Sequence, residues 1–103
     1  MQTISTNKNK VSYLFAVNTI DQLNQIKQVT CTIFGGYTLT TCSGGWVSPE
    51  NELIQETSYK LEVITTKDYQ YIDNLGQHIA KIGKQKEVYF YIDNLKLNIV
   101  NNY

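Results

Sequence analysis

The hydrophobic residues of this chain repeat with two periods, and the order of these periods restricts the fold more than any other feature of the sequence. Residues 11–18 alternate with the period of a β-strand, and residues 20–33 then place an apolar side chain at every third or fourth position, as an amphipathic helix does. The same change of period recurs further along the chain. The predicted strands are residues 11–18, 37–46, 53–65 and 87–92, and the predicted helices are residues 20–33 and 69–82.

Short polar and glycine segments indicate where the two helices begin and end. Thr19 and Gln22 have the spacing of a capping box, which satisfies free backbone N–H groups at the start of a helix. The glycines at 35–36 follow the last apolar position and can take the left-handed conformation that ends a helix. For the second helix, Thr66 is the expected cap and Gly83 the expected end.

The order of these elements is β-α-β-β-α-β, with a turn at residues 48–51 between the two middle strands. This order predicts an α+β domain of the ferredoxin-like type, in which two helices pack on one face of a four-stranded antiparallel sheet. We expect a single domain over residues 1–103. Residues 1–10 and 101–103 are polar and are expected to be fringes of the fold, whereas residues 97–100 can add a short edge strand.

Charge and cysteine content exclude several classes of function. Nine lysines, no arginine and nine acidic residues give a net charge of zero, which is not the basic surface of a typical DNA- or RNA-binding protein. No apolar run is long enough to span a membrane, and the polar start MQTISTNKNK does not resemble a signal peptide, so we expect a cytoplasmic protein. Cys31 and Cys42 form no C-x-x-C motif, and His78 is the one histidine. We therefore expect reduced core cysteines, a half-exposed helix histidine, no metal site and no cofactor.

The first and last strands are apolar on both faces, although helices can cover one face only. Leu14 and Ala16 alternate with the core residues of the first strand, and Tyr89 and Tyr91 do the same in the last strand. We therefore expect the uncovered face of the sheet to be buried between the subunits of an oligomer. The alternative is a monomer whose tyrosines line a solvated sheet.

The third strand divides its residues between the two faces of the sheet by alternation. The residues expected on the helix side are Tyr59, Leu61 and Val63, and those expected on the uncovered side are Glu56, Ser58, Lys60 and Glu62. If the hairpin turns at residues 49–50, Glu56 lies about one strand-width from Trp46, and a carboxylate near an indole can hold a cationic or hydrogen-bonding ligand. The alternative is that Glu56 pairs with a lysine on a solvated strand.

Gly44 and Gly45 interrupt the second strand directly before Trp46. Glycine inside a strand marks a β-bulge, or a place where another molecule closely approaches the backbone. Backbone N–H groups, the hydroxyls of Thr38 and Thr40 and an aromatic ring together suit a nucleoside or a phosphate-bearing ligand. The alternative is a twisted hairpin whose bulge only lets Trp46 fold back onto the core.

The spacing of GGYT, SGGW, a charged turn, a strand with an internal glutamate, a helix and VYFYID, over roughly residues 34–92, resembles a family of small phage proteins. These are PII-like, ferredoxin-like trimers. They include the phage S-adenosylmethionine lyases, which cleave S-adenosylmethionine to methylthioadenosine and homoserine lactone. The resemblance implies a trimer or a hexamer with ligands bound in clefts between subunits. A strand glutamate lies near the sulfonium in the lyases, and the matching residue here is Glu56, with Trp46 and Tyr37 as possible walls of the site.

The residues and the resemblance together predict a protein that binds a nucleotide-type small molecule between subunits. Phages use small oligomers of this kind to sequester nucleotide signals of host defence systems, and such a protein would act in the host cytoplasm. The alternative is an S-adenosylmethionine lyase with Glu56 as its catalytic residue, and a third possibility is a module whose edges recruit another protein. The expected ligand-binding residues are Tyr37, Thr38, Thr40, Gly44, Gly45, Trp46, Glu56, Ser58 and Lys60.

Overall fold

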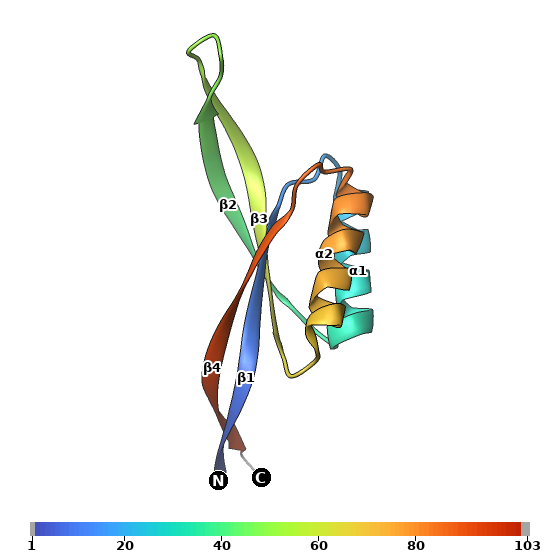
Figure 1. Cartoon of the computed structure of the whole chain (residues 1–103), viewed down its shortest axis with the longest axis vertical. Coiled ribbons are helices and arrows are strands. Elements are labelled where there is room, and N and C mark those ends of the chain that lie inside the picture. The colour runs from blue at the N-terminus through green and yellow to red at the C-terminus, as the bar shows by residue number, and fades with distance from the viewer. Residues whose placement is uncertain (1, 102–103) are drawn as a thin grey trace.

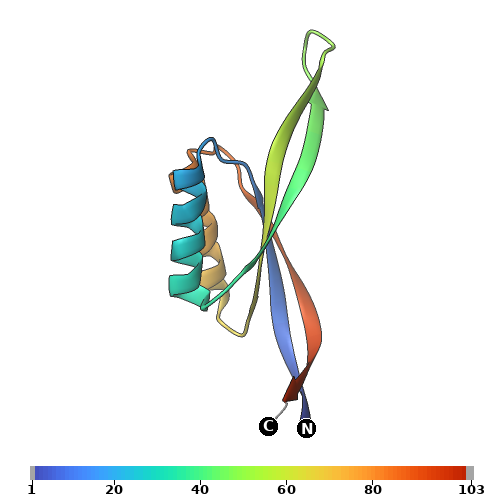
Figure 2. The same ribbon diagram turned by 180° about the vertical axis from the view of Figure 1, so that it is seen from behind.

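A computed structural model, which describes residues 2–101, has a four-stranded antiparallel sheet with both helices on one face (Figure 1). The elements are β1 (Gln2–Phe15), α1 (Ile20–Phe34), β2 (Thr38–Val47), β3 (Leu53–Thr65), α2 (Tyr69–Gly83) and β4 (Tyr89–Asn101). The strands lie in the order β2-β3-β1-β4. The view from behind shows the same two layers, with no helix on the second face of the sheet (Figure 2). The predicted β-α-β-β-α-β arrangement is therefore confirmed.

The first helix begins and ends where its local chemistry predicts. The Gln22 backbone N–H donates to the Thr19 hydroxyl at 3.1 Å, and the Thr19 N–H donates to the Gln22 side chain at 3.1 Å, so the capping box is present. Gly35 ends the helix with φ of 86°, and its N–H donates to the carbonyl of Cys31 at 2.8 Å. A left-handed glycine avoids the steric cost that a side chain would have at this φ.

The second helix begins later than predicted. Its N-cap is Asp68 rather than Thr66, and no side chain caps its first N–H groups. The chain between β3 and α2 is held instead by a hydrogen bond from the Lys67 N–H to the hydroxyl of Thr65, at 2.9 Å. At its other end, the helix runs through Gly83, and Lys84 takes the left-handed conformation with φ of 52°.

The core lies between the helices and the helix-facing side of the sheet. Its fully or nearly buried apolar residues are Val11, Tyr13, Phe15, Leu23, Ile26, Leu61, Val63, Ile72, Leu75 and Ile79. The other residues of the predicted helix stripes are less buried: Val29, Ile33 and Ile82 are partly buried against the core, whereas Ile20 and Tyr69, in the first turns of their helices, are 69% and 61% exposed. The cysteines are free, as expected, but neither is a core residue: Cys31 is exposed and Cys42 is half-buried.

The outer strands are longer than the sequence pattern predicts. Residues 2–10 are not a fringe but the first part of β1, and residues 97–100 are not a separate edge strand but the end of β4. These segments pair with each other, so that Ile4 lies opposite Ile99. Met1 and residues 102–103 lie outside the described part of the chain.

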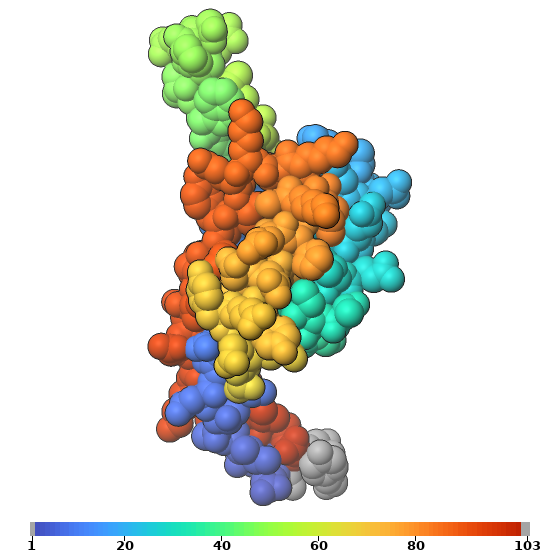
Figure 3. Space-filling view, turned by 45° about the vertical axis from the view of Figure 1, so that its right-hand side comes forward, coloured from blue at the N-terminus to red at the C-terminus, as the bar shows by residue number. Residues whose placement is uncertain are grey.

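The helices cover only the middle of an elongated molecule of 58 × 24 × 24 Å. The β2–β3 hairpin extends past them at one end, and a two-stranded ribbon of β1 and β4 extends past them at the other (Figure 3). The hairpin turn forms at residues 48–51 as predicted, with Asn51 N–H donating to the carbonyl of Ser48 at 2.9 Å. None of the helices in residues 2–101 is long and apolar enough to cross a membrane.

Candidate functional site

The candidate site lies on the sheet face opposite the helices, which we call the open face. Two rows of residues cross its centre from β2 through β3 and β1 to β4. They are Thr38, Glu62, Ser12 and Tyr91 in one row, and Thr40, Lys60, Leu14 and Tyr89 in the other. Leu14, Tyr91 and Tyr89 are 37%, 44% and 63% exposed. The division of β3 between the two faces is as predicted, since Leu61 and Val63 are buried against the helices.

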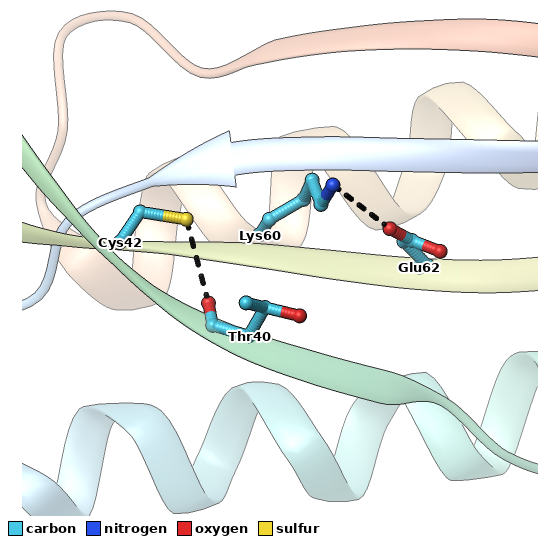
Figure 4. Close-up of polar contacts among 4 residues, drawn as sticks. All are labelled: Thr40, Cys42, Lys60 and Glu62. Carbon is cyan, nitrogen blue, oxygen red and sulfur yellow. Dashed lines mark hydrogen bonds and ion pairs between the residues drawn. The ribbon is translucent and has the colours of Figure 1, made fainter.

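Lys60 is already paired within the chain. Its ammonium lies 3.2 Å from a carboxylate oxygen of Glu62, two residues along the same face of β3 (Figure 4). The hydrogen bond to Glu62, followed by the negative charge of that carboxylate, raises the pKa of Lys60 above its usual value. A ligand that uses Lys60 would therefore have to share this cation with Glu62.

Ser12 is a buried hydroxyl at the centre of the open face. Its side chain is fully buried, and its Oγ has no hydrogen-bond partner among residues 2–101. A buried hydroxyl without a partner costs free energy relative to one exposed to water. The described chain therefore offers no hydrogen-bond partner for the hydroxyl at the centre of the open face.

Gly44 and Gly45 do not form a β-bulge. The pairing of β2 with β3 runs without a break through Gly44 opposite Glu56, Gly45 opposite Gln55 and Trp46 opposite Ile54. Neither glycine has a positive φ. The predicted alternative, a bulge that folds Trp46 onto the core, is wrong, since Trp46 is 51% exposed on the projecting hairpin.

The two glycines differ in the room around them. A Cβ on Gly44 would meet only the Ser58 hydroxyl, at 3.9 Å, whereas a Cβ on Gly45 would lie 3.3 Å from the carbonyl of Ile54. Gly44 is on the open face with Glu56, and Gly45 is on the opposite face of the hairpin. The chain's own packing therefore does not require glycine at position 44, which leaves the backbone accessible beside Glu56.

Glu56 and Ser58 line a concavity at the base of the hairpin. The connection from α2 to β4 forms its other side through Gln85, Glu87 and Tyr89, and its volume is about 210 Å³. The Tyr89 hydroxyl donates to Glu87. This hydrogen bond and the negative charge of Glu87 raise the pKa of Tyr89. Two carboxylates and two hydroxyls thus surround one small space. Their oxygens can accept hydrogen bonds from a ligand, and the carboxylates can attract a cationic group.

Tyr37 and Thr38 lie at a different place from Glu56 and Trp46. They line a second concavity of about 260 Å³ together with residues of α1 and of the far end of β3, among them Phe34 and Glu62. Trp46 follows Thr38 by eight positions in an extended strand, which is about 27 Å along β2. One chain therefore brings Gly44, Trp46, Glu56 and Ser58 together on one face but keeps Tyr37 apart from them.

The α2–β4 connection was missed by the interpretation of the sequence. The last strand was predicted to begin at Glu87, but β4 begins at Tyr89, and Gln85 and Glu87 lie outside regular elements beside Glu56 of β3. Of the residues on this side of the concavity, the sequence analysis had assigned Tyr89 to the open face, from the alternation of the last strand. Among residues 2–101 no three His, Cys, Asp or Glu side chains are grouped as a metal site would need, and His78 is exposed on α2.

Comparison with known proteins identifies the architecture through solved structures. No protein-family model and no curated protein sequence matches the chain. A CutA structure from Synechococcus elongatus has a TM-score of 0.67 at 14% identity, over 95% of this chain and 85% of that one. The B. subtilis GlnK–ATP complex has a TM-score of 0.65 at 14% identity, over 86% of this chain and 82% of that one. The chain has the PII-like form of the ferredoxin-like fold.

A further structure with this PII-like fold comes from a phage enzyme. It is a phage SAM lyase in complex with S-methyl-5'-thioadenosine, with a TM-score of 0.62 at 15% identity, over 89% of this chain and 90% of that one. The predicted resemblance to PII-like proteins and, loosely, to phage SAM lyases is confirmed at the level of the fold. Identities of this size concern the arrangement of the elements and do not extend to the chemistry of a site.

Proposed function

We propose that this PII-like protein forms a homo-oligomer, a trimer or a hexamer, and binds a nucleotide-type small molecule in clefts between its subunits. The observation that carries the proposal is the concavity at Glu56 on the open face. Its volume of about 210 Å³ is below the range of roughly 300–1,000 Å³ that is usual for small-molecule sites. A second subunit laid on the open face would close the concavity and add the missing walls.

The composition of the open face supports assembly. Leu14, Tyr89 and Tyr91 expose apolar surface in adjacent positions of β1 and β4. Contiguous apolar surface of this kind is typical of a protein–protein interface. The orphaned hydroxyl of Ser12 lies in the same area, where a polar group of a neighbouring subunit could satisfy it.

The concavity at Tyr37 and the concavity at Glu56 can belong to one cleft only if they come from two different chains. Thr38, next to Tyr37, lies about 27 Å along β2 from Trp46 in the same subunit. A closed ring of subunits with heterologous contacts brings different surfaces of neighbouring chains together. In the proposed assembly, the Tyr37 concavity of one subunit faces the Glu56 concavity of the next, and the ligand lies between them.

The side chains at Glu56 suit the nucleoside part of a ligand. Glu56 and Glu87 accept hydrogen bonds, as ribose hydroxyls and base amino groups require. Tyr89 and Trp46 offer exposed rings on which a base can stack. Lys84 and Lys86, in the same connection as Gln85, are exposed cations for a phosphate group. We propose that the biological role is sequestration of a nucleotide immune signal by a phage counter-defence protein, in the host cytoplasm.

The first test is to identify what the protein retains from the cell. Purified protein is denatured, and the released small molecules are identified by mass spectrometry. The proposal expects a nucleotide-type compound in a stoichiometric ratio to the oligomer. Glu56→Gln should weaken rebinding of that compound by about 1 to 3 kcal/mol, because one charged acceptor is lost. Glu52→Gln, an exposed change near the hairpin turn, is the matched control and should leave binding unchanged. Equal affinity in both variants would reject the role of Glu56.

A second candidate function is an S-adenosylmethionine lyase. It is favoured by the two carboxylates, Glu56 and Glu87, in one concavity, since a carboxylate pair attracts a sulfonium cation. The substrate's own carboxylate would attack its γ-carbon, which forms the lactone ester bond and breaks the carbon–sulfur bond, so that methylthioadenosine leaves with the electron pair. Glu56 would position the sulfonium for this attack.

The two functions are separated by incubation of the protein with S-adenosylmethionine. The binding protein should produce no methylthioadenosine. A lyase should produce it steadily, and Glu56→Gln should then reduce turnover by orders of magnitude, because a charge that stabilises the reacting centre is lost. Steady formation that is lost in Glu56→Gln would replace our first proposal with the second.

A further inference from the structure

Both ends of the molecule are two-stranded ribbons that project past the helices (Figure 1). At one end, residues 2–8 of β1 pair only with residues 95–101 of β4, and we call this part the β1–β4 ribbon. At the other, residues 53–58 of β3 pair only with residues 42–47 of β2, and we call residues 42–58 the hairpin end. A two-stranded ribbon is marginally stable alone in water and gains stability when an apolar face packs against another layer.

One face of the β1–β4 ribbon is apolar, although the described helices lie on the other side of the sheet. On the open face, Ile4 lies opposite Ile99, and Leu97 and Leu95 continue the row toward the centre of the sheet. Ile4 and Ile99 are 44% and 37% exposed. The opposite face of the ribbon is mainly polar. This apolar strip on the open face is therefore a surface that a further layer can bury.

The hairpin end also presents apolar side chains on the open face. Trp46 lies opposite Ile54, and Trp46 is 51% exposed whereas Ile54 is half-buried. Val47 and Leu53, the next pair along the hairpin, lie on its opposite face. The open face of the hairpin end is continuous with the centre of the open face, which the proposed function makes an interface between subunits.

The two ends carry charges of opposite sign. The charged residues of the hairpin end are Glu50, Glu52 and Glu56, and those of the β1–β4 ribbon are Lys8 and Lys96. None of these five residues forms an ion pair within residues 2–101. Lys8 lies on the open face with the apolar strip, and Glu56 lies on the open face with Trp46. Charge complementarity therefore favours contact between unlike ends and disfavours contact between two like ends.

We propose that the hairpin end of one subunit docks, by its open face, on the apolar strip of the β1–β4 ribbon of a second copy of this chain. Such a contact is heterologous, so it can close into a ring of subunits. The inference rests on the oligomer of the proposed function and adds the surfaces that join its subunits. It is consistent with the proposed cleft, because the Tyr37 concavity includes Ile64, which pairs with Lys10 beside the ribbon, whereas Glu56 belongs to the hairpin end.

The test measures the dissociation constant of the full-length oligomer by sedimentation velocity in variants that change one face only. Ile99→Glu changes the open face of the ribbon, and Val100→Glu changes the next residue of β4, on the opposite face. Ile54→Lys and Leu53→Lys are the corresponding pair in the hairpin end. Ile99→Glu and Ile54→Lys should each raise the dissociation constant about tenfold or more, because a charge is buried without a partner, and the two controls should not. All four variants should keep the circular dichroism spectrum of the unmodified protein.

Mixing two variants separates contact between unlike ends from contact between like ends. Ile99→Glu keeps an intact hairpin end, and Ile54→Lys keeps an intact ribbon. At a concentration where each variant alone is monomeric, an equimolar mixture should contain a dimer with one copy of each. Contact between two hairpin ends, or between two ribbons, would give the mixture no species that the separate variants lack.

The contribution of charge is tested by Lys8→Glu and Lys96→Glu at low ionic strength. The two variants change the net charge equally, but Lys8 lies on the open face of the ribbon and Lys96 on the opposite face. Lys8→Glu should therefore raise the dissociation constant about threefold or more above that of Lys96→Glu.

The outcomes distinguish this inference from the proposed function. A monomeric unmodified protein would overturn both. An oligomer that Ile99→Glu and Ile54→Lys leave intact would overturn the contact between unlike ends and retain the proposed oligomer. Equal losses in each variant and its control, or the absence of the mixed dimer, would also reject this contact.

Discussion

Ser12 and Tyr13 are neighbours in β1, and both are fully buried, but they lie on opposite faces of the sheet. The Tyr13 hydroxyl, on the helix-covered face, donates to the carbonyl of Ile72 in α2 at 2.7 Å. The Ser12 hydroxyl, on the open face, has no partner among residues 2–101. Buried polar groups in native proteins are nearly always hydrogen-bonded. The hydroxyl on the covered face is thus satisfied by the chain's own helix, whereas the hydroxyl on the open face has no partner within the described chain.

The apolar residues of the covered face are also less exposed than those of the open face. Leu61 and Val63 on the covered face are 0% and 2% exposed, whereas Leu14 and Tyr91 on the open face are 37% and 44% exposed. All four residues lie in the central part of the sheet, where the helices cover one face and no helix covers the other (Figure 2). The following predictions test whether the open face is a second interior that forms only on assembly.

The largest effect on folding is expected from Leu61→Ala, which leaves a cavity between sheet and helices. It should lower the free energy of unfolding by about 2 to 5 kcal/mol. Leu14→Ala removes the same atoms from the open face and should cost about 1 kcal/mol or less in protein dilute enough to be monomeric. Denaturation by urea, followed by circular dichroism, measures both. Equal losses at low concentration would mean that the open face is already covered within one chain.

The next effect concerns assembly. Tyr91→Lys places a charge at the centre of the open face and should raise the dissociation constant of the oligomer about a hundredfold, or by about 2.8 kcal/mol. Tyr71→Lys is a matched control, because Tyr71 is 46% exposed but lies on α2, away from the open face. Sedimentation velocity should find a smaller species for Tyr91→Lys only. Dissociation by both variants, or by neither, would count against an interface at the open face.

A smaller effect is expected from Tyr13→Phe. Loss of the hydrogen bond to Ile72 should cost about 0.5 to 1.5 kcal/mol at pH 7. Burial, and then the charge of Asp73, raise the pKa of Tyr13 above its ordinary value of 10.0. The folded state therefore keeps this proton after the unfolded state has released it, so the contribution is complete below pH 10 and falls as the pH rises above it, by up to about 1.4 kcal/mol per pH unit. Urea denaturation at pH 7 and above pH 10 should show the variant losing less stability than the parent, and a parallel decline would contradict the assignment.

The smallest effect is expected from Ser12→Ala. In dilute monomer it should raise the free energy of unfolding by about 1 kcal/mol, because no hydrogen bond is lost and a desolvated hydroxyl is removed. In the oligomer, a partner that satisfies the hydroxyl would make the same change cost about 1 kcal/mol per subunit. Denaturation at two protein concentrations measures the difference. A loss of 1 kcal/mol in the monomer itself would show that Ser12 has a partner within the chain.

Local chemistry made the helices and the division of β3 predictable. The capping box at Thr19 and the left-handed Gly35 depend only on residues within a few positions of each other. The alternation of Leu61 and Val63 with their neighbours depends only on the two-residue period of a strand. These features would be present in any fold that uses these segments as a helix and a strand.

Features that depend on pairing partners were not predictable. Residues 2–10 are polar because the ribbon that they form with β4 has no helix over it, so the apolar alternation that identifies a strand is weak there. The predicted start of α2 was wrong because Thr66 and Asp68 are both residue types that favour the N-cap position. Which of them begins the helix depends on how the chain leaves β3. Glu56 and Glu87 line the same concavity because of the strand order, which puts β1 between β3 and β4. The distance from Tyr37 to Trp46 follows from an unbroken β2, where the glycines had indicated a bulge.

An interface between copies of this chain at the open face is required both for the proposed oligomer and for its ligand clefts. The direct measurement is the mass of the unmodified protein at micromolar concentration, by light scattering or native mass spectrometry. We expect three or six times the chain mass of 11.8 kDa, with a nucleotide-type compound bound to the intact assembly. A mass of 11.8 kDa throughout the micromolar range would contradict both the interface and the clefts proposed between subunits.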